Sequence, residues 1–377
     1  MKNDERILNA QGRLDWLRLI RSENVGPRTF AKLIDRYGTA GAALAALPEL
    51  ARRGGRARPI AVCPKAEAER ELEAAARIGA IPLASCEPGY PRALAAIDDA
   101  PPLIYVLGNP SVLGRSTVAM VGARNASVNG RNLARRIAAD LGHAGLVVAS
   151  GLARGIDTAA HEGSLATGTV AVMAGGVDVI YPPENATLHR DIAAAGAVVS
   201  EMPPGIQPQA SHFPRRNRIV SGLALGVVVV EASPRSGSLI TARLAMEQGR
   251  EVFAVPGSPL DARAQGPNGL IRQGATLTES AADVLRVLDD LLRRPLAEPG
   301  RGGGWSGGPA SPPEEAELAR VRSTIVESLG PTPVTVDEII RQCQLSPSVV
   351  SMVLLELELA GRLERHSGHK VSLLVGC

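Results

Sequence analysis

The chain has 377 residues, of which 45% are hydrophobic and only 2% aromatic. This length allows two or three domains, and the scarcity of aromatic residues means that the core is built mainly from Ala, Val, Leu and Ile, as suits a parallel sheet covered by alanine-rich helices. The formal net charge of +3 is too small to indicate a nucleic-acid-binding protein by itself, so any anion site must be a local cluster of charge.

The ends and the cysteines indicate a cytoplasmic protein. Residues 1–16 are charged and lack the apolar core of a signal peptide, and no stretch reaches eighteen uninterrupted apolar residues. We therefore expect neither secretion nor a membrane span. The cysteines show no CxxC spacing and no disulfide framework, which fits a reducing compartment; they are Cys63, Cys86, Cys343 and Cys377.

Residues 1–95 are predicted to form a helical domain. Residues 14–23 have apolar side chains at helical spacing, and a second helix follows the turn Asn24–Pro27. This NVGP turn resembles the hairpin of helix-hairpin-helix modules, whose backbone N–H groups can hold a phosphate, with Asn24 in place of the usual glycine. A plain packing unit of helices explains so short a motif equally well.

Residues 100–295 alternate strands and helices. Continuous apolar runs predict strands at 116–122, 146–151, 169–176, 197–204, 226–233 and 251–257. Each run leads through a Gly- or Pro-containing loop into a helix, which predicts a doubly wound, mainly parallel sheet. Because ligands bind beyond the carboxyl ends of such strands, we expect one rim to carry the loops 122–127, 150–156, 174–185, 201–218, 231–240 and 256–269.

The C-terminal part predicts a flexible linker at 298–313 and a winged-helix domain at 314–377. The linker is rich in Gly, Pro and Ser. The recognition helix of the winged helix is predicted at Ser346–Ala360, which carries Glu356 and Glu358 and no Lys or Arg. Helices that read DNA present basic or amide side chains to the groove, so a protein-contact or accessory module is favoured over a duplex reader.

The loop at 121–130, VGARNASVNG, lies where a Rossmann fold holds the phosphates of a dinucleotide. The fingerprint G-x-G-x-x-G is not met, because Arg124 and Ser127 stand at its second and third glycine positions. The next strand ends in Ser150 and Gly151 rather than in an acid that could hold a ribose. Both departures argue against NAD, whereas Arg124 offers a fork of donors to a phosphate.

Two further rim loops have the small residues that suit a polyanion. In SGLARGID, residues 150–157, Gly151 and Gly155 free backbone N–H groups at a helix start and Arg154 adds charge. We interpret Asp157 as a helix-start residue and His161 as structural or hydrogen-bonding. The loop at 233–243 adds Arg235, Ser236, Gly237, Ser238 and Thr241. Tyr181 and its two prolines predict a rigid loop, with Asn185 starting the next helix.

The segment HFPRRNR, residues 212–218, combines three arginines with one of three phenylalanines in the chain. A stacking face beside cations suits single-stranded nucleic acid, because every base has a π-face and every linkage a phosphate. The alternative is a helix start in which an arginine pairs with Glu231 or Glu201. Both can hold if one or two arginines organise the loop and the others face the ligand.

No metal or cofactor motif stands out. His366 and His369 have no further ligands nearby, and there is no Walker lysine, GxSxG or HExxH pattern. We therefore predict no metal, no cofactor and no catalytic residue.

Six motifs together resemble the DNA-processing protein A family, also called DprA or Smf. They are VAMVGARNAS, SGLARGIDTAAHEGSL, GGVDVIYPPEN, SEMPPG, HFPRRNRIVSGL and EASPRSGSLITARLAMEQGREVFAVPG, in this order over about residues 110–280. The resemblance implies an extended Rossmann domain that binds single-stranded DNA, flanked by a SAM-like or helix-hairpin-helix-like domain and a winged helix. It also implies loading of the RecA recombinase during natural transformation, dimerisation through the Rossmann domain and no enzymatic reaction.

By motif match, Arg124 would contact phosphate, the SGLARG backbone would help, and Phe213, Arg216 and Arg218 would line the path of the strand. Some members have a basic residue just before the phenylalanine motif, where this chain has 207–211, QPQAS. The predicted DNA-binding set is Gly122, Arg124, Ser127, Ser150, Gly151, Arg154, Gly155, Phe213, Arg215, Arg216, Asn217, Arg218, Ser236, Gly237 and Ser238. We expect Arg124→Ala, and Arg216→Ala with Arg218→Ala, to weaken binding without unfolding the sheet.

The alternative is a nucleotide-binding or nucleotide-hydrolysing enzyme of the lysine-decarboxylase-like group, whose Rossmann sheet is similar. Those enzymes share PGGxGTxxE, whereas this chain has EASPRSGSLITAR at 231–243, with no matching glutamate on the helix. A third interpretation, a dinucleotide sensor, is disfavoured by Arg124 in place of glycine.

Overall fold

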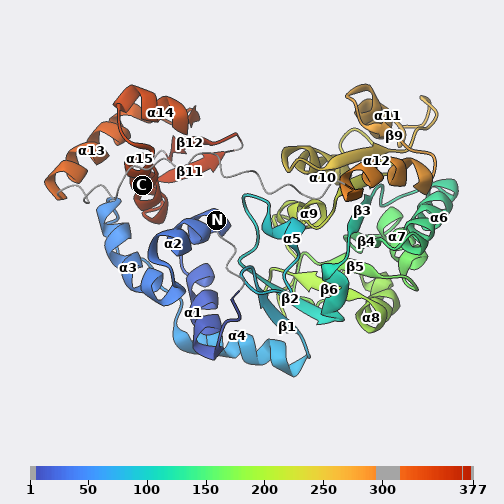
Figure 1. The fold of residues 1–377 in the computed structure, drawn as a ribbon, viewed down its shortest axis with the longest axis horizontal. Helices are drawn as coiled ribbons and strands as arrows, with labels where there is room; N and C mark the ends of the chain where they lie inside the picture. The colour runs from blue at the N-terminus through green and yellow to red at the C-terminus, as the bar shows by residue number, and fades with distance from the viewer. Residues whose placement is uncertain (1–5, 294–314, 367, 375–377) are drawn as a thin grey trace. The chain divides into compact units, whose positions relative to one another are not determined.

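The computed structural model describes residues 6–293, 315–366 and 368–374, so the predicted linker at 298–313 lies outside the described residues. The chain divides into two compact units (Figure 1). Within the described residues, one comprises residues 9–68 and those from 315 onward, and the other, here called the central unit, comprises residues 6–8 and 69–293.

The central unit, which contains residues 69–293, is built on a nine-stranded sheet in the order β1-β2-β6-β5-β4-β3-β7-β8-β9. Its strands are β1 (Ile81–Ala84), β2 (Leu103–Gly108), β3 (Thr117–Val121), β4 (Val147–Ser150), β5 (Thr169–Val172), β6 (Ala197–Ser200), β7 (Gly226–Val229), β8 (Glu251–Ala254) and β9 (Thr276–Leu277). From β6 to β9 all neighbours are parallel, whereas β1 with β2 and β2 with β6 are antiparallel. The predicted doubly wound, mainly parallel sheet is confirmed.

Helices cover both faces of this sheet (Figure 1). They are α5 (Arg92–Ala95), α6 (Val128–His143), α7 (Ile156–Ser164), α8 (Ala186–Ala195), α9 (His212–Gly222), α10 (Gly237–Glu247), α11 (Gln265–Arg272) and α12 (Ala281–Arg293), with short 3₁₀ helices η1 (Pro110–Gly114) and η2 (Pro183–Asn185). Because successive side chains of a strand point to opposite faces, Val118 and Met120 of β3 pack with α6, α7 and α12. Ala119 and Val121 pack in the cluster of α5, α9, α10 and α11.

The sheet starts earlier in the chain than the predicted boundary between residues 95 and 100. β1 pairs with β2 along its whole length, and the central unit begins at Glu69. β1 has the sequence IPLA, an apolar run of only four residues that contains a proline, and a proline within a run argues against a strand. A proline is tolerated there because β1 is the edge strand.

The chain adds strands to the sheet on one side of β3 first and on the other side afterwards. The chain moves outward from β3 through β4 and β5 to β6 on one side, and from β7 through β8 to β9 on the other. The crevice between β3 and β7 is therefore the topological switch point, where dinucleotides bind in Rossmann folds.

The other unit contains N-terminal helices and a winged helix. Its helices are α1 (Ala10–Arg21), α2 (Pro27–Tyr37), α3 (Ala40–Arg53), α13 (Glu315–Ser328), α14 (Val336–Cys343) and α15 (Pro347–Leu359), and α4 (Lys65–Arg77) crosses the boundary between the two units. A small sheet of β10 (Val334–Thr335), β11 (Leu363–His366) and β12 (Lys370–Leu373) forms the wing. The predicted hairpin and recognition helix are confirmed at these positions, with Ser346 capping α15.

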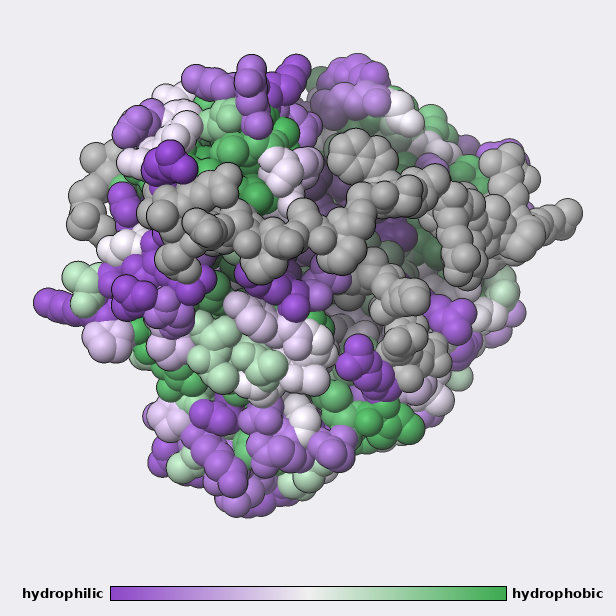
Figure 2. Space-filling view, turned by 60° about the vertical axis from the view of Figure 1, so that its left-hand side comes forward, coloured by the Kyte–Doolittle hydropathy of each residue, from purple (hydrophilic) through white to green (hydrophobic). Residues whose placement is uncertain are grey.

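No described helix is long and apolar enough to cross a membrane. On the face shown in Figure 2, hydrophilic and hydrophobic residues are interspersed.

Candidate nucleic-acid interface

The loops that leave β3, β4 and β5 meet the start of α9 around a shallow recess at the carboxyl ends of the strands. The recess has a volume of about 30 Å³. That is close to the space of one water molecule and far below the several hundred Å³ of a small-molecule pocket. Its lining residues are Arg124, Gly151, Ala153, Arg154, Tyr181, Pro182, Phe213 and Arg216.

Two aromatic rings and a guanidinium group form the centre of this surface. The guanidinium carbon of Arg124 lies 5.5 Å from the centroid of the Phe213 ring, within cation–π range. The Tyr181 ring lies 5.7 Å from the Phe213 ring, centroid to centroid, and 46% of Tyr181 is exposed. Tyr181 was interpreted only as part of a rigid loop, so its place beside Phe213 is a finding of the structure.

The exposed cations here are only partly compensated. Among the residues that the structure describes, no carboxylate lies within ion-pair distance of Arg124. Arg154 lies 3.7 Å from Glu184, but both side chains are more than half exposed, so the pair is weak. Arg215 is also exposed and lies 3.7 Å from Glu201. The surface therefore keeps a positive charge next to its aromatic rings.

Arg216 is buried and holds the loop after β4 in place. Its Nη1 donates to the carbonyl oxygens of Gly151 at 2.6 Å and Val172 at 2.7 Å. Burial lowers the pKa of Arg216, against the opposing effect of Asp157. A Cβ atom on Gly151 would lie 2.0 Å from Nη1, so only glycine fits this contact. The Arg216 side chain thus lines the recess from the interior of the protein.

The same loop is fastened by two buried polar side chains. The Asp157 carboxylate accepts hydrogen bonds from the backbone N–H groups of Gly151, at 3.1 Å, and Ala153, at 3.3 Å. Burial raises the pKa of Asp157, while Arg216 and these hydrogen bonds oppose the rise. Asn185 is the N-cap residue of α8, as predicted, but its side chain makes no capping hydrogen bond; its amide instead donates to the Leu152 carbonyl at 2.9 Å. Gly155 completes the turn with a φ of +83°, a conformation that favours glycine.

Arg218 does not line the recess. It is buried and donates to the Glu201 carboxylate and to the backbone carbonyl of Asp99. The alternative in which an arginine of this segment pairs with Glu201 is therefore confirmed. Asn217 beside it is half-buried.

His161 lies buried behind Arg216 and Asp157. Its Nδ1 is 2.7 Å from the Thr169 hydroxyl, which donates its own proton to the Val148 carbonyl at 2.8 Å. The ring nitrogen must then be the donor, so Nδ1 carries a proton. Burial, followed by the charge of Arg216, lowers the pKa of His161 to about 3. The expectation of a structural, hydrogen-bonding histidine is confirmed.

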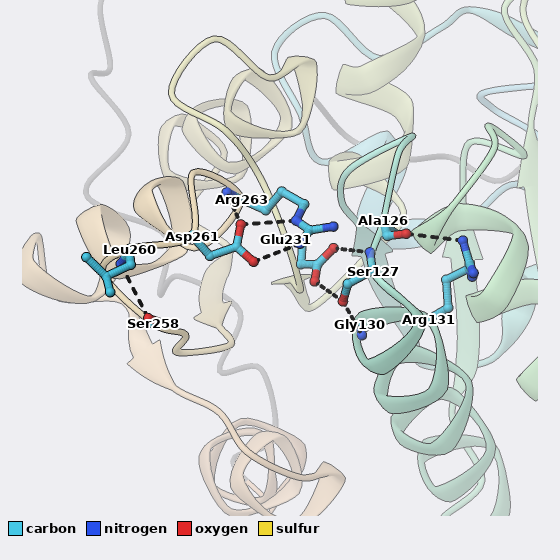
Figure 3. Close-up of polar contacts among 9 residues, drawn as sticks. All are labelled: Ala126, Ser127, Gly130, Arg131, Glu231, Ser258, Leu260, Asp261 and Arg263. Atoms are coloured by element: carbon cyan, nitrogen blue, oxygen red, sulfur yellow. Dashed lines mark hydrogen bonds and ion pairs between the residues drawn. The ribbon is translucent and has the colours of Figure 1, made fainter.

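The crevice at the switch point is filled by the chain's own acid (Figure 3). Glu231, which follows β7, accepts hydrogen bonds from the Ser127 backbone N–H at 2.9 Å and the Ser127 hydroxyl at 2.6 Å. Ser127 in turn caps α6 by accepting from the Gly130 N–H at 2.8 Å. A carboxylate therefore occupies the helix N-terminus at which Rossmann folds hold the phosphates of a dinucleotide.

Other predicted hydroxyls support the rim from inside. The Ser238 hydroxyl donates to the Gly122 carbonyl at 2.8 Å, which joins the loop after β7 to the loop after β3. Ser236 caps α10, and Gly237 beside it is exposed. The buried Ser150 hydroxyl donates to the Met120 carbonyl at 2.6 Å. Within the described residues, the structure thus places these serine hydroxyls in internal hydrogen bonds.

Family comparisons cover all three parts of this architecture. The model described as DNA recombination-mediator protein A matches residues 82–289, more than half of the chain. A DprA-like N-terminal HHH domain matches residues 10–74, and a DprA winged helix domain matches residues 309–369. The chain belongs to the DNA recombination-mediator protein A family.

Relatives named after this family share much of the sequence. The DNA processing protein DprA of Streptococcus pneumoniae is 48% identical over 52% of this chain and 70% of its own length. The protein Smf of Escherichia coli is 39% identical over 76% of each chain.

Solved structures of the family share the fold. The crystal structure of DprA from Streptococcus pneumoniae has 36% sequence identity and a TM-score of 0.64, and covers 74% of this chain and 98% of its own. The Helicobacter pylori DNA processing protein A has 28% identity and a TM-score of 0.52, over 56% of this chain and 96% of its own. Its structure is described as showing a unique single-stranded DNA binding mode.

Proposed function

We propose that this member of the DNA recombination-mediator protein A family binds single-stranded DNA across the rim formed by the loops after β3, β4 and β5 and the start of α9. The observation that carries the proposal is the geometry of Arg124. Its exposed guanidinium lies over the Phe213 ring with no carboxylate paired to it among the described residues. This arrangement offers a phosphate donor and a stacking face to one nucleotide.

The exposure of each residue assigns its role. Arg124, Arg154 and Arg215 contact phosphates, and Phe213 stacks a base with Tyr181 beside it. Arg216 and Arg218 do not contact DNA but hold the loops in place through buried hydrogen bonds. The hydroxyl groups of four serines do the same; they are Ser127, Ser150, Ser236 and Ser238. Gly237, where a Cβ atom would meet nothing within 4 Å, leaves room for the DNA strand, whereas Gly122, Gly151 and Gly155 leave room for the chain's own atoms.

The small recess and the occupied crevice favour a polymer over a mononucleotide. A recess of about 30 Å³ cannot enclose a nucleobase, so a bound base must lie against the surface. Glu231 is engaged by Ser127 and is therefore not free to act on a substrate. Both points favour a binding protein over a nucleotide hydrolase.

The resemblance to the family supports a finer role, which we propose as well. We propose that the chain is a cytoplasmic recombination mediator without a reaction of its own, active in DNA uptake and transformation. We further propose that it dimerises through the Rossmann domain and loads RecA onto the bound strand. The loading step is tested by the rate of RecA ATP hydrolysis on single-stranded DNA, with and without the chain; an unchanged rate would remove this step.

The binding step is tested by fluorescence anisotropy with a labelled thymine oligomer, single-stranded or in a duplex, over a series of salt concentrations. We expect a preference for the single strand and an affinity that falls with salt, because phosphate contacts release counterions. Equal affinity for both forms, or no binding at low salt, would contradict the proposal.

A further inference from the structure

The recognition helix of the winged helix, α15, is covered on more than one side. Residues 353–357 are all buried, and so are Leu359 and Ala360. The burial is concentrated in the C-terminal half of α15, since Pro347 and Ser348 at its start are exposed and Ser351 and Met352 are half-buried. A helix that reads a DNA groove leaves one polar face open to the groove.

One side of α15 packs into its own domain. Val350, Val353, Leu354 and Leu357 form a core with residues of α13, α14 and the wing. The residues outside this core are Leu355, Glu356, Leu359 and Ala360, and they are buried as well. What covers them must come from elsewhere in the same compact unit.

The cover is the end of α3. Arg362 donates from Nη1 to the Gly54 carbonyl at 3.3 Å. A Cβ atom on Gly54 would lie 2.0 Å from the Glu356 carbonyl oxygen and 2.8 Å from the Ala360 side chain. The two helices therefore meet backbone against backbone at a position that admits only glycine.

The second contact is the NVGP hairpin. The Asn24 side-chain amide donates to the Leu359 carbonyl at 3.1 Å, and Asn24 takes a left-handed φ of +58°. Carbonyl groups in the last turn of a helix lack partners inside the helix, so this amide satisfies one of them. The turn that could hold a phosphate thus lies against the C-terminal end of α15.

The two glutamates of α15 form ion pairs within the same compact unit. Glu356 is 1% exposed and pairs with Arg322 at 2.6 Å, and Glu358 pairs with Arg365 at 2.8 Å. Lys32 of α2 lies near this second pair. These acids are therefore held by arginines of the winged helix and need no external partner.

From these contacts we infer that the winged-helix domain is a protein-contact module whose partner is the N-terminal helical domain of the same chain. The C-terminal half of α15 is the contact surface, and Gly54 with the Asn24 hairpin is the surface that receives it. In this docked state the C-terminal half of α15 and the hairpin are covered and do not read DNA. The inference concerns a unit separate from the rim and is independent of the proposed function.

Gly54→Ala in the full chain is the direct test. Gly54 has a φ of −68° and a ψ of −3°, so alanine fits its backbone and the only obstacle is the facing helix. The matched control is Gly330→Ala, since nothing lies within 4 Å of a Cβ atom there. Circular dichroism and thermal unfolding establish that both variants fold.

The measurement is amide hydrogen exchange by mass spectrometry, in peptides covering 40–56 and 350–360. We expect Gly54→Ala to speed exchange about tenfold in both segments, because local opening exposes both partners together. Asn24→Gly, which keeps the left-handed backbone, is expected to have a smaller effect in the same segments. Exchange equal to the Gly330→Ala control would overturn the inference, as would protection of 350–360 by duplex DNA in the unaltered chain.

Discussion

Replacing Arg124 with alanine tests the rim most directly. A hydrogen bond from a charged group contributes about 1.5–3 kcal/mol. The contact of Arg124 with Phe213, 5.5 Å from the ring centroid, is worth about 0.5–1 kcal/mol, and part of it is given up when the guanidinium turns to a phosphate. The net loss on substitution is then about 1–2 kcal/mol, or roughly 5- to 30-fold in Kd.

The salt dependence gives a second, independent number. Each phosphate contact on a single strand contributes about 0.7 to the slope of log K against log salt concentration, so Arg124→Ala should flatten the slope by about that amount. Anisotropy titrations at several salt concentrations measure both quantities on one oligomer.

The matched control is Arg136→Ala. Arg136 lies on α6 with 82% of its side chain exposed, away from the recess, and its nearest carboxylate is Asp140 at 4.0 Å. We expect this variant to bind like the unaltered chain. If Arg124→Ala and Arg136→Ala have the same affinity and the same salt slope, the assignment of the rim is wrong.

Three further variants test the supporting structure. Arg216→Ala removes the buried charged hydrogen bonds to the Gly151 and Val172 carbonyls, at about 1.5–3 kcal/mol each, so urea denaturation should show a loss of about 3–6 kcal/mol in the free energy of unfolding; undiminished stability would contradict its structural role. His161 has a folded pKa of about 3, below its ordinary 6.5, so the native state loses stability as the pH falls from 6.5 towards 3. His161→Gln should therefore lose about 2 kcal/mol less than the unaltered chain between pH 7 and pH 5, and an identical loss would refute this. Glu231→Ala should cost about 1–2 kcal/mol by removing the acceptor of Ser127, with thermal unfolding as the measurement and an unchanged Tm as the contrary result.

The core of the sheet could be predicted from the sequence because its strands are continuous apolar runs. Strands β3 to β8 all have this pattern and lead into loops and helices. The antiparallel edge could not be predicted in the same way. β1 contains Pro82, and its pairing with β2 depends on residues distant in the chain.

The rim could be predicted in outline but not in the direction of its side chains. Because parallel strands end at one edge, Arg124, Arg154 and Phe213 were expected to be neighbours, and the recess brings them together. Within HFPRRNR, however, Arg215 is exposed while Arg216 and Arg218 are buried. Their direction depends on where Asp157 and Glu201 lie, and no local pattern in the sequence contains that information. The double change at Arg216 and Arg218 is therefore expected to destabilise the fold as well as binding.

On the proposed function, the carboxylate at the start of α6 limits competition from free nucleotides for the DNA-binding loops. A vacant helix N-terminus at the switch point would attract the phosphates of ATP or NAD, and those small anions would compete with a nucleic-acid ligand for the neighbouring loops. The Glu231 side chain already occupies that position through its hydrogen bonds with Ser127. On the proposed function, the affinity for a DNA strand is thereby insulated from the metabolic state of the cell, because mononucleotides find no place of their own beside it.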